Sequence, residues 1–374
     1  MRATRASLES RATAPITAVR TAAFRIPTDA PESDGTLAWH ATTLVVVEID
    51  AAEKHGLGWT YADAGVAQTI QDHLRPALRT RDALAIEALW AEMIARLRNL
   101  GRQGAALMAV SAVDVALWDL KAKLLGVPLV ALLGRARDAF PLYGSGGFTS
   151  YSDAQLERQF LGWAERGITR FKMKVGRDPA ADRHRVRAAR AVIGGAAELF
   201  VDANSAYTRN QALEAARMFV DEADVRWFEE PLAPDDFAGL HFLRLRVPPQ
   251  LELAEGEYGS DLDYFQRLLA ADAVDVVMPD ATRCGGITGF RKVGVLCETA
   301  RRPMSSHCAP SLHAHLGCAL PALRHGEYFH DHARIEHELF DGAPLPKNGQ
   351  LRPDPDRPGL GLEFKWADAE RYAT

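Results

Sequence analysis

The fold is decided by residues 199–257, in which three short apolar runs each end in an acid: Leu199-Phe200-Val201-Asp202, Val225-Arg226-Trp227-Phe228-Glu229 and Leu251-Glu252-Leu253-Ala254-Glu255-Gly256-Glu257. The terminal acids Asp202, Glu229 and Glu257 recur at nearly equal intervals along the chain. A buried strand followed by a helix needs about this length, and repeats of such units close into a parallel barrel.

Acids at the carboxyl ends of barrel strands converge on one mouth of the barrel. Three carboxylates in one place repel one another unless a cation lies between them, and oxygen-only ligands favour a hard metal, above all Mg²⁺. The sequence therefore predicts an enzyme with a magnesium site formed by Asp202, Glu229 and Glu257.

The alternation of strands and helices extends beyond this stretch, from Gly134 to about Glu336. Helical segments such as Ser152–Arg166 and Asn210–Glu222 separate most of the strands. The strand candidates are Phe140–Gly144, Thr169–Val175, Leu199–Asp202, Val225–Glu229, Leu251–Glu257, Val274–Asp280, Met304–His307 and Glu327–His330. This pattern predicts an α/β protein with a TIM-like (β/α) barrel of seven or eight strands.

A different pattern precedes the barrel. Residues Ile16–Ile49 favour strands, interrupted by an expected mobile loop over Pro27–Trp39, and a second loop is expected over His55–Gly65. Helical periodicity dominates Val66–Leu125, with Gly126 as its end signal. We expect a disordered tail over residues 1–15, an α+β capping domain over 16–135, the barrel over 136–335, and a segment over 336–374 that returns to the cap.

Composition excludes several classes of protein. The chain of 374 residues has a formal net charge of −5, so a nucleic-acid partner is not expected. No apolar run has the length of a membrane span. Its 4 cysteines lack paired spacing and no signal peptide is evident, which favours reduced thiols in the cytoplasm.

Further candidate site residues lie on the other strands. Lys172 and Lys174 share one face of a strand because side chains alternate, and they would point into the barrel; taken alone they also fit a solvated edge strand. Asp280 and His307 end neighbouring strands, where the carboxylate would fix the imidazole tautomer. For this pair taken alone, a capped turn and an ordinary histidine are the favoured explanation. Glu327 would face the centre from the last strand, although its default explanation is solvent exposure.

With its motifs in this order, the chain resembles members of the enolase superfamily, specifically its mandelate-racemase-like group. The resemblance extends from about Ile16 to Lys365. The matching motifs are Lys172 and Lys174 as KxK, Asp202 in VDAN, Glu229 in WFEEP, Glu257 after Gly256, the His307–Asp280 dyad, Glu327, and residues 111–119 with 126–129 as the cap helix and its exit. The resemblance implies a (β/α) barrel with an α+β cap, three metal ligands and a homo-oligomer. For the third metal ligand the match to the family is ambiguous, because Glu255 and Glu257 are both acids at the end of this strand. We choose Glu257 because the family's ligand follows a glycine, and Glu255 is the alternative.

The resemblance implies removal of the proton α to a substrate carboxylate. Lys174 would be the base on one face of the α-carbon, with its pKa lowered by Lys172 and the metal, and His307 would act on the opposite face. Lys172 and a protonated Glu327 would bind the substrate carboxylate. Dehydration of an acid sugar, an aldonate or aldarate, to a 2-keto-3-deoxy acid is the favoured outcome, with racemisation or epimerisation as the alternative.

Substrate specificity would come from the cap loops and from strand ends. We expect substrate contacts from His55, Trp59, Tyr61, Asn204 and Arg283, and Arg283 would bind a distal carboxylate of a diacid.

Three rival interpretations remain. His313 and His315 suggest a zinc hydrolase, but at i and i+2 on a helix they face apart. A lactonising enzyme or dipeptide epimerase would carry a lysine near Asp280, which the sequence Asp280-Ala281-Thr282-Arg283 lacks. A non-catalytic barrel with a binding role is the third.

Overall fold

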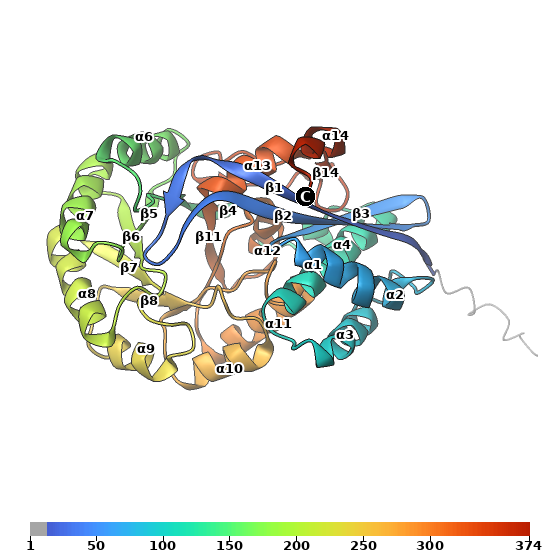
Figure 1. Ribbon diagram of the computed structural model, residues 1–374, viewed down its shortest axis with the longest axis horizontal. Coiled ribbons are helices and arrows are strands. Elements are labelled where there is room, and N and C mark those ends of the chain that lie inside the picture. The colour runs from blue at the N-terminus through green and yellow to red at the C-terminus, as the bar shows by residue number, and fades with distance from the viewer. Residues whose placement is uncertain (1–12) are drawn as a thin grey trace, which may run out of the picture.

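The computed structural model describes residues 13–374, and its larger part is a closed barrel of parallel strands (Figure 1). Hydrogen bonds join each strand to the next and join the last strand back to the first. The strands are β4 (Phe140–Gly146), β5 (Arg170–Lys174), β6 (Glu198–Asp202), β7 (Val225–Glu229), β8 (Glu252–Glu255), β9 (Val276–Val277), β10 (Met304–Ser306) and β11 (Leu323–Phe329). All the predicted strands are present, although β9 and β10 are shorter than expected.

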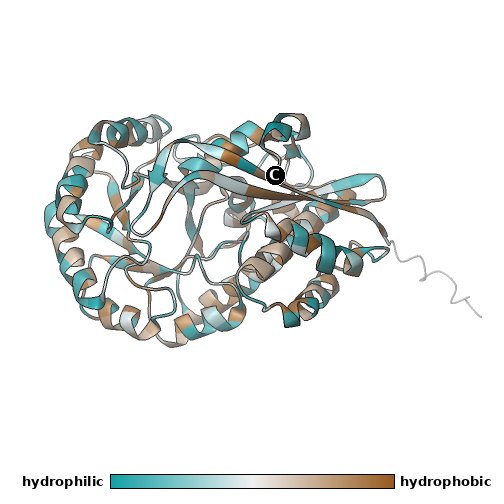
Figure 2. Ribbon diagram, in the orientation of Figure 1, coloured by the Kyte–Doolittle hydropathy of each residue, from teal (hydrophilic) through white to brown (hydrophobic). Residues whose placement is uncertain are grey.

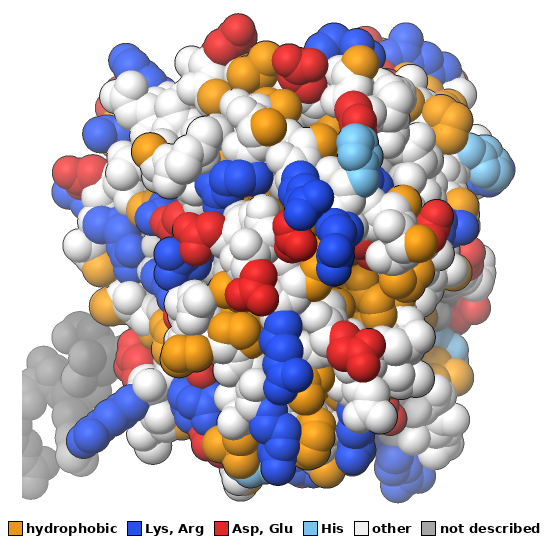
Figure 3. Space-filling model, turned by 90° about the vertical axis from the view of Figure 1, so that its left-hand side faces the viewer, with side chains coloured by type: hydrophobic (Ala, Val, Ile, Leu, Met, Phe, Trp, Pro, Cys, Tyr) orange, Lys and Arg blue, Asp and Glu red, His pale blue; other side chains and the backbone are white. Residues whose placement is uncertain are grey.

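Helices surround the barrel, and Figure 3 shows basic and acidic side chains intermingled on one side of the molecule. The helices are α6 (Asp153–Ala164), α7 (Pro179–Ile193), α8 (Arg209–Ala223), α9 (Phe237–Arg244), α10 (Leu262–Ala270), α11 (Gly286–Ala300), α12 (Pro310–Ala319) and α13 (His330–Leu339). Exposed ion pairs such as Arg187–Glu222 and Arg209–Asp236 link successive helices. Such pairs contribute little to stability, so burial of the inner helix faces holds this layer in place.

The cap is a three-stranded antiparallel sheet of β1 (Ile16–Ser33), β2 (Ala38–Ala51) and β3 (Lys54–Tyr61), with helices packed on it. Hydrophobic residues, brown in Figure 2, follow these strands where they cross the cap. The cap helices are α1 (Gly65–Thr69), α2 (Arg75–Leu78), α3 (Ile86–Arg96), α4 (Ala105–Leu125) and α5 (Leu129–Leu133). Helix α4 ends at Gly126 in the left-handed conformation, as its sequence predicts.

The expectations of a mobile loop over Pro27–Trp39 and of a second loop over His55–Gly65 are wrong, because most of both segments lies in strands. Proline is tolerated at position 27 because β1 is an edge strand. Gly56 and Gly58 serve close packing: a Cβ atom on them would lie 2.2 and 2.1 Å from carbonyl oxygens of helix α4. These glycines therefore allow helix α4 to pack closely on the strand. In the sequence alone, glycines at such positions look the same as the glycines of a loop.

The turn between β1 and β2, residues 34–37, reaches over the barrel mouth. The Thr36 hydroxyl donates a hydrogen bond to the Asn204 carbonyl (3.1 Å), and Arg177 donates to the carbonyls of Asp34 (3.1 Å) and Leu37 (2.7 Å). Gly35 contacts the barrel most closely, since a Cβ atom there would lie 2.2 Å from the Ala203 carbonyl oxygen. The turn therefore covers the ends of β5 and β6.

Replacing Gly35 with alanine is expected to lift this turn from the barrel mouth and lower kcat/KM. Overpacking of this kind costs about 1–3 kcal/mol, equivalent to roughly 5- to 140-fold in the population of the closed cap. Steady-state kinetics and the rate of proteolysis within residues 34–37 would measure the effect. Gly162→Ala is the matched control, because nothing lies within 4 Å of the Cβ position there. Equal kinetics for the two variants would contradict the assignment of the turn as a cover.

The C-terminal segment returns to the cap. Strand β12 (Phe340–Asp341) pairs with β14 (Glu363–Phe364), β13 (Gln350–Leu351) pairs with β4, and α14 (Trp366–Ala369) follows. The rings of Phe364 and Trp366 lie 5.2 and 5.9 Å from Phe24 of β1. The segment therefore completes the core beneath the cap sheet.

The N-terminal tail expected over residues 1–15 falls mostly outside the described residues. Of its last residues, Ala14 is buried and Pro15 bridges to Asp82, so they belong to the cap. Within residues 13–374, no helix combines the length and the apolar character that crossing a membrane requires.

Candidate active site

Three acids meet at the carboxyl ends of neighbouring barrel strands. Asp202 ends β6, Glu229 ends β7 opposite it in register, and Glu257 follows β8. One oxygen from each lies within 4.8 Å of the others, and all three side chains are buried. Beneath them a layer of interior side chains fills the barrel, and Trp227 donates a hydrogen bond to Glu229 (2.8 Å). Parallel strand register therefore places these carboxylates together.

The chemistry of this cluster suits a hard divalent cation. Buried carboxylates are costly without a balancing charge, and oxygen donors are those that Mg²⁺ prefers. Glu257 Oε2 has no hydrogen-bond partner among residues 13–374, although it lies 3.4 Å from His307 Nε2. Asp202, Glu229 and Glu257 would therefore hold the metal.

Glu255, the alternative third ligand, lies in a different setting. Its carboxylate accepts a hydrogen bond from the Gly256 N–H (2.9 Å) and lies beside Glu230. Burial raises the pKa of Glu255 to about 8, so it is a largely neutral acid at pH 7. The geometry favours Glu257, because Glu255 does not belong to the three-acid cluster.

Both lysines of β5 point into the barrel at these acids. Lys172 contacts Glu229 and lies 2.7 Å from Glu327, and Lys174 donates to Asp202 (2.6 Å). Burial alone would lower the pKa of each lysine, but the adjacent carboxylates raise both pKa values above the ordinary one. The expectation of a lowered pKa for Lys174 is therefore not met in this arrangement, because Asp202 stabilises its proton.

The predicted dyad is formed on the opposite side of the mouth. His307 Nδ1 lies 2.8 Å from Asp280 Oδ2, and Asp280 is buried. Burial would raise the pKa of Asp280, but the hydrogen bond and charge of His307 hold it well below its usual range. Asp280 therefore stays ionised and directs Nε2, the other ring nitrogen, towards the acid cluster.

Glu327 also faces the centre, from within β11. Its Oε2 atom accepts a hydrogen bond from the Cys308 N–H (2.8 Å) and lies 3.8 Å from His307 Nε2. Burial would raise the pKa of Glu327, but Lys172 and His307 hold it well below its ordinary value. The expectation of a protonated Glu327 is therefore corrected: in this ion pair with Lys172 it is a carboxylate.

Two residues expected to contact substrate, Arg283 and Asn204, lie at the site but form hydrogen bonds with other residues of the protein. Arg283 donates to the Glu257 carbonyl and carboxylate, both at 3.2 Å, so its charge is paired with Glu257 in this structure. Binding of a distal substrate carboxylate by Arg283 stays a prediction. Asn204 donates to Glu230 (3.1 Å), while its Oδ1 atom has no partner in the described part of the chain. Contact between Asn204 and a substrate stays a prediction, and the unpartnered Oδ1 atom is the group that could make it.

The three residues expected to contact substrate from the second cap loop are engaged in other contacts of the cap. His55 is exposed, pairs with Asp50 (2.7 Å) and lies beside the β2–β3 turn at the far end of the sheet. Trp59 is fully buried against Phe340. Tyr61 stacks on His332, with ring centroids 3.4 Å apart, behind the turn that follows β10. Strand geometry explains these positions, because the segment spans the cap sheet.

Cys308 is a site residue that the sequence pattern did not reveal. Its sulfur lies 3.1 Å from His307 Nε2, and its backbone adopts a positive φ of 50°. Glycine or asparagine would have signalled such a conformation, but cysteine gives no such signal.

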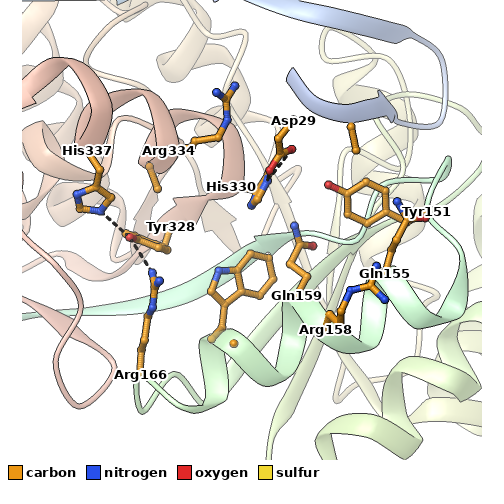
Figure 4. Close-up of a pocket in the computed structure, with 14 residues that line it drawn as sticks. Asp29, Tyr151, Gln155, Arg158, Gln159, Arg166, Tyr328, His330, Arg334 and His337 are labelled. Atoms are coloured by element: carbon orange, nitrogen blue, oxygen red, sulfur yellow. Dashed lines mark hydrogen bonds and ion pairs between the residues drawn. The ribbon is translucent and has the colours of Figure 1, made fainter. Parts of the chain in front are cut away.

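A cavity of about 630 Å³ lies outside the barrel wall, between α6 and α13 (Figure 4). Tyr328 faces this cavity and contacts His337 (2.9 Å), while its neighbour Glu327 faces the barrel interior. Successive side chains of β11 thus point to opposite sides of the wall. None of the predicted catalytic residues lines this cavity.

The chain is similar to known proteins over most of its length. Residues 16–134 match the N-terminal domain of the mandelate racemase and muconate lactonizing enzyme family, and residues 155–369 match the enolase C-terminal domain-like family. A 3,6-anhydro-alpha-L-galactonate cycloisomerase from Streptomyces coelicolor is 35% identical over 95% of this chain and 99% of its own.

Solved structures show the same similarity. A mandelate racemase/muconate lactonizing enzyme-like protein from Rubrobacter xylanophilus has a TM-score of 0.94 at 50% identity, covering 96% of this chain and 100% of its own. An L-talarate dehydratase from Polaromonas, complexed with Mg and L-glucarate, has a TM-score of 0.86 at 34% identity, covering 97% and 98%. The chain belongs to the enolase superfamily, in its mandelate racemase and muconate lactonizing enzyme group.

Proposed function

We propose that this protein is a Mg²⁺-dependent enzyme that removes the proton α to the carboxylate of an acid sugar and dehydrates it to a 2-keto-3-deoxy acid. One observation carries the proposal: the barrel mouth holds Lys174 and the His307–Asp280 dyad on either side of a three-carboxylate cluster. Two acid/base groups that flank a carboxylate cluster able to hold a metal suit proton removal from one side and proton delivery from the other.

Mg²⁺, bound by Asp202, Glu229 and Glu257, would supply positive charge against the negative charge that develops as the α-proton leaves. Lys172 adds a fixed positive charge beside the same acids. The buried position of these side chains excludes water, which strengthens their electrostatic effect on a substrate.

Lys174, once deprotonated, takes the α-proton at Nζ. The C–O bond at the β-carbon then breaks, and His307 delivers a proton from Nε2 to the departing hydroxyl, which leaves as water. The resulting enol becomes the 2-keto-3-deoxy acid. Asp280 stabilises the protonated imidazole and keeps its ring oriented during this transfer.

The relatives support the reaction class. Those with curated names include an L-talarate/galactarate dehydratase that is 32% identical over 85% of this chain and an arabinonate dehydratase that is 30% identical over 90%. Isomerisation is the second candidate, either as cycloisomerisation or as racemisation or epimerisation. The specific observation in its favour is the similarity to the cycloisomerase from Streptomyces coelicolor.

Proton NMR in D₂O with Mg²⁺, over a library of aldonates, aldarates and their anhydro derivatives, tests the proposal. A dehydratase converts one acid to a keto-deoxy product with loss of the α-proton and the β-hydroxyl. Deuterium at the α-carbon without elimination identifies a racemase or epimerase, and a ring-opened or ring-closed isomer identifies a cycloisomerase. Absence of exchange across the library would contradict the proposed function and support a barrel that only binds.

A further inference from the structure

His313 joins the two loops that carry the His307–Asp280 dyad. It lies in the first turn of helix α12 and is buried, with 1% of its surface exposed. Its Nδ1–H donates a hydrogen bond to the Cys308 carbonyl (2.8 Å), and its Nε2 accepts one from the Ala281 N–H (3.2 Å). Because a carbonyl only accepts and an amide only donates, these partners fix one neutral tautomer.

The two loops have few other links. Strands β9 and β10 share a single residue pair, Met304 with Val277, and beyond it one backbone bond runs from the His307 N–H to the Pro279 carbonyl (3.1 Å). By contrast, β5 and β6 pair over all five of their residues, up to Lys174 and Asp202. The separation between His307 and Asp280 therefore depends on side-chain contacts.

The turn after β10 is also strained. Cys308 and Ala309 both have positive φ values, of 50° and 40°, which cost free energy in residues other than glycine. The His313 ring holds the Cys308 carbonyl, and His332 Nδ1 lies 3.4 Å from the Ala309 N–H as a weaker second support. Surrounding contacts must maintain such a turn, because the isolated chain would relax it.

We propose that His313 is a positioning residue for the catalytic dyad: it clamps the loops after β9 and β10 so that the His307–Asp280 hydrogen bond keeps its geometry. It touches no reacting atom. Burial holds the pKa of His313 below its ordinary value, which agrees with a clamp that must stay neutral to accept from Ala281. The catalytic consequence rests on the proposed function, whereas the structural consequence does not.

His315 offers a matched control on the same helix. It is equally buried and also makes two hydrogen bonds, but to the Val130 N–H (3.2 Å) and the Leu360 carbonyl (3.0 Å), away from the dyad. Replacing either histidine with phenylalanine removes two buried hydrogen bonds at similar volume. A loss of stability is therefore common to both variants, and a change at the dyad should be specific to His313→Phe.

The first experiment observes the dyad without substrate. The Nδ1–H proton of His307, hydrogen-bonded to a carboxylate, should give a low-field proton NMR signal, assigned by its absence in His307→Asn. We expect this signal to shift or broaden in His313→Phe and to persist in His315→Phe. An unchanged signal in folded His313→Phe would overturn the proposal. If His313→Phe does not fold, His313→Gln, which preserves an acceptor for Ala281, serves instead, with an intermediate change expected and no change overturning it.

The second experiment uses the substrate found in the NMR library. With His313→Phe we expect kcat for dehydration to fall by about 10²-fold, a loss typical of a misplaced catalytic group. We expect KM to stay near the wild-type value and Lys174-dependent exchange of the α-proton to continue. Wild-type kcat would overturn the clamp, as would equal losses in His313→Phe and His315→Phe. If no acid sugar reacts with the wild-type enzyme, the proposed function fails, while the low-field signal still decides the role of His313.

Discussion

Lys174→Ala is expected to lower kcat for the acid-sugar substrate by about 10²–10⁴-fold, the contribution typical of a positioned general base. The reason is the location of Lys174 Nζ, at the end of β5 and 2.6 Å from Asp202. The measurement is single-turnover dehydration together with exchange of the α-proton in D₂O. Exchange should be lost along with dehydration, because the same amine removes the proton in both.

His307→Asn provides the comparison, since it alters the group on the other side of the mouth. If dehydration is the reaction, this variant should lose elimination yet retain part of the α-proton exchange catalysed by Lys174. If α-proton exchange is instead lost in His307→Asn and retained in Lys174→Ala, then His307 is the base that removes the α-proton and Lys174 acts on the other face. Full activity in either variant would rule out the mechanism.

Glu257→Gln is expected to weaken Mg²⁺ binding by about 10²-fold or more, because a ligand carries more of the affinity than the outer-shell residues whose loss costs 10–100-fold. Glu257 belongs to the cluster with Asp202 and Glu229, and its Oε2 atom has no hydrogen-bond partner among the described residues. Calorimetric titration with Mg²⁺ measures the affinity without any substrate.

Glu255→Gln is the matched control for this prediction. The two acids are separated by Gly256, and both are buried. Because burial raises the pKa of Glu255 to about 8, replacing it with a neutral amide removes little charge at pH 7 and should leave Mg²⁺ affinity nearly unchanged. A large loss in Glu255→Gln with none in Glu257→Gln would make Glu255 the third ligand.

Much of the fold and of the site geometry could be predicted from the sequence, for a physical reason. Apolar runs that end in acids, such as the one before Asp202, report both burial and the position of a strand end. Parallel strands bring such ends together whatever the intervening helices contain. Asp280, just beyond β9, follows from the same rule. Lys172 and Glu327 lie within β5 and β11 instead, and their inward direction follows from the alternation of side chains along a strand.

Features that depend on contacts between distant segments could not be predicted. The long strand β1 contains Pro27, and β3 contains two glycines that fit against helix α4, so both carry the composition of loops. The contact of Arg283 with Glu257, and the clamp formed by His313, depend on how two loops approach each other. No periodicity in the sequence encodes that distance.

The return of the C-terminal segment to the cap has a consequence for biosynthesis. The rings of Phe364 and Trp366 complete the packing around Phe24, and Ala373 bridges to the same residue. A ribosome releases the N-terminal strands long before these partners emerge. The nascent cap must therefore wait, with an apolar face uncovered, until the whole barrel has been synthesised, which makes it the part of the chain with most need of chaperone protection.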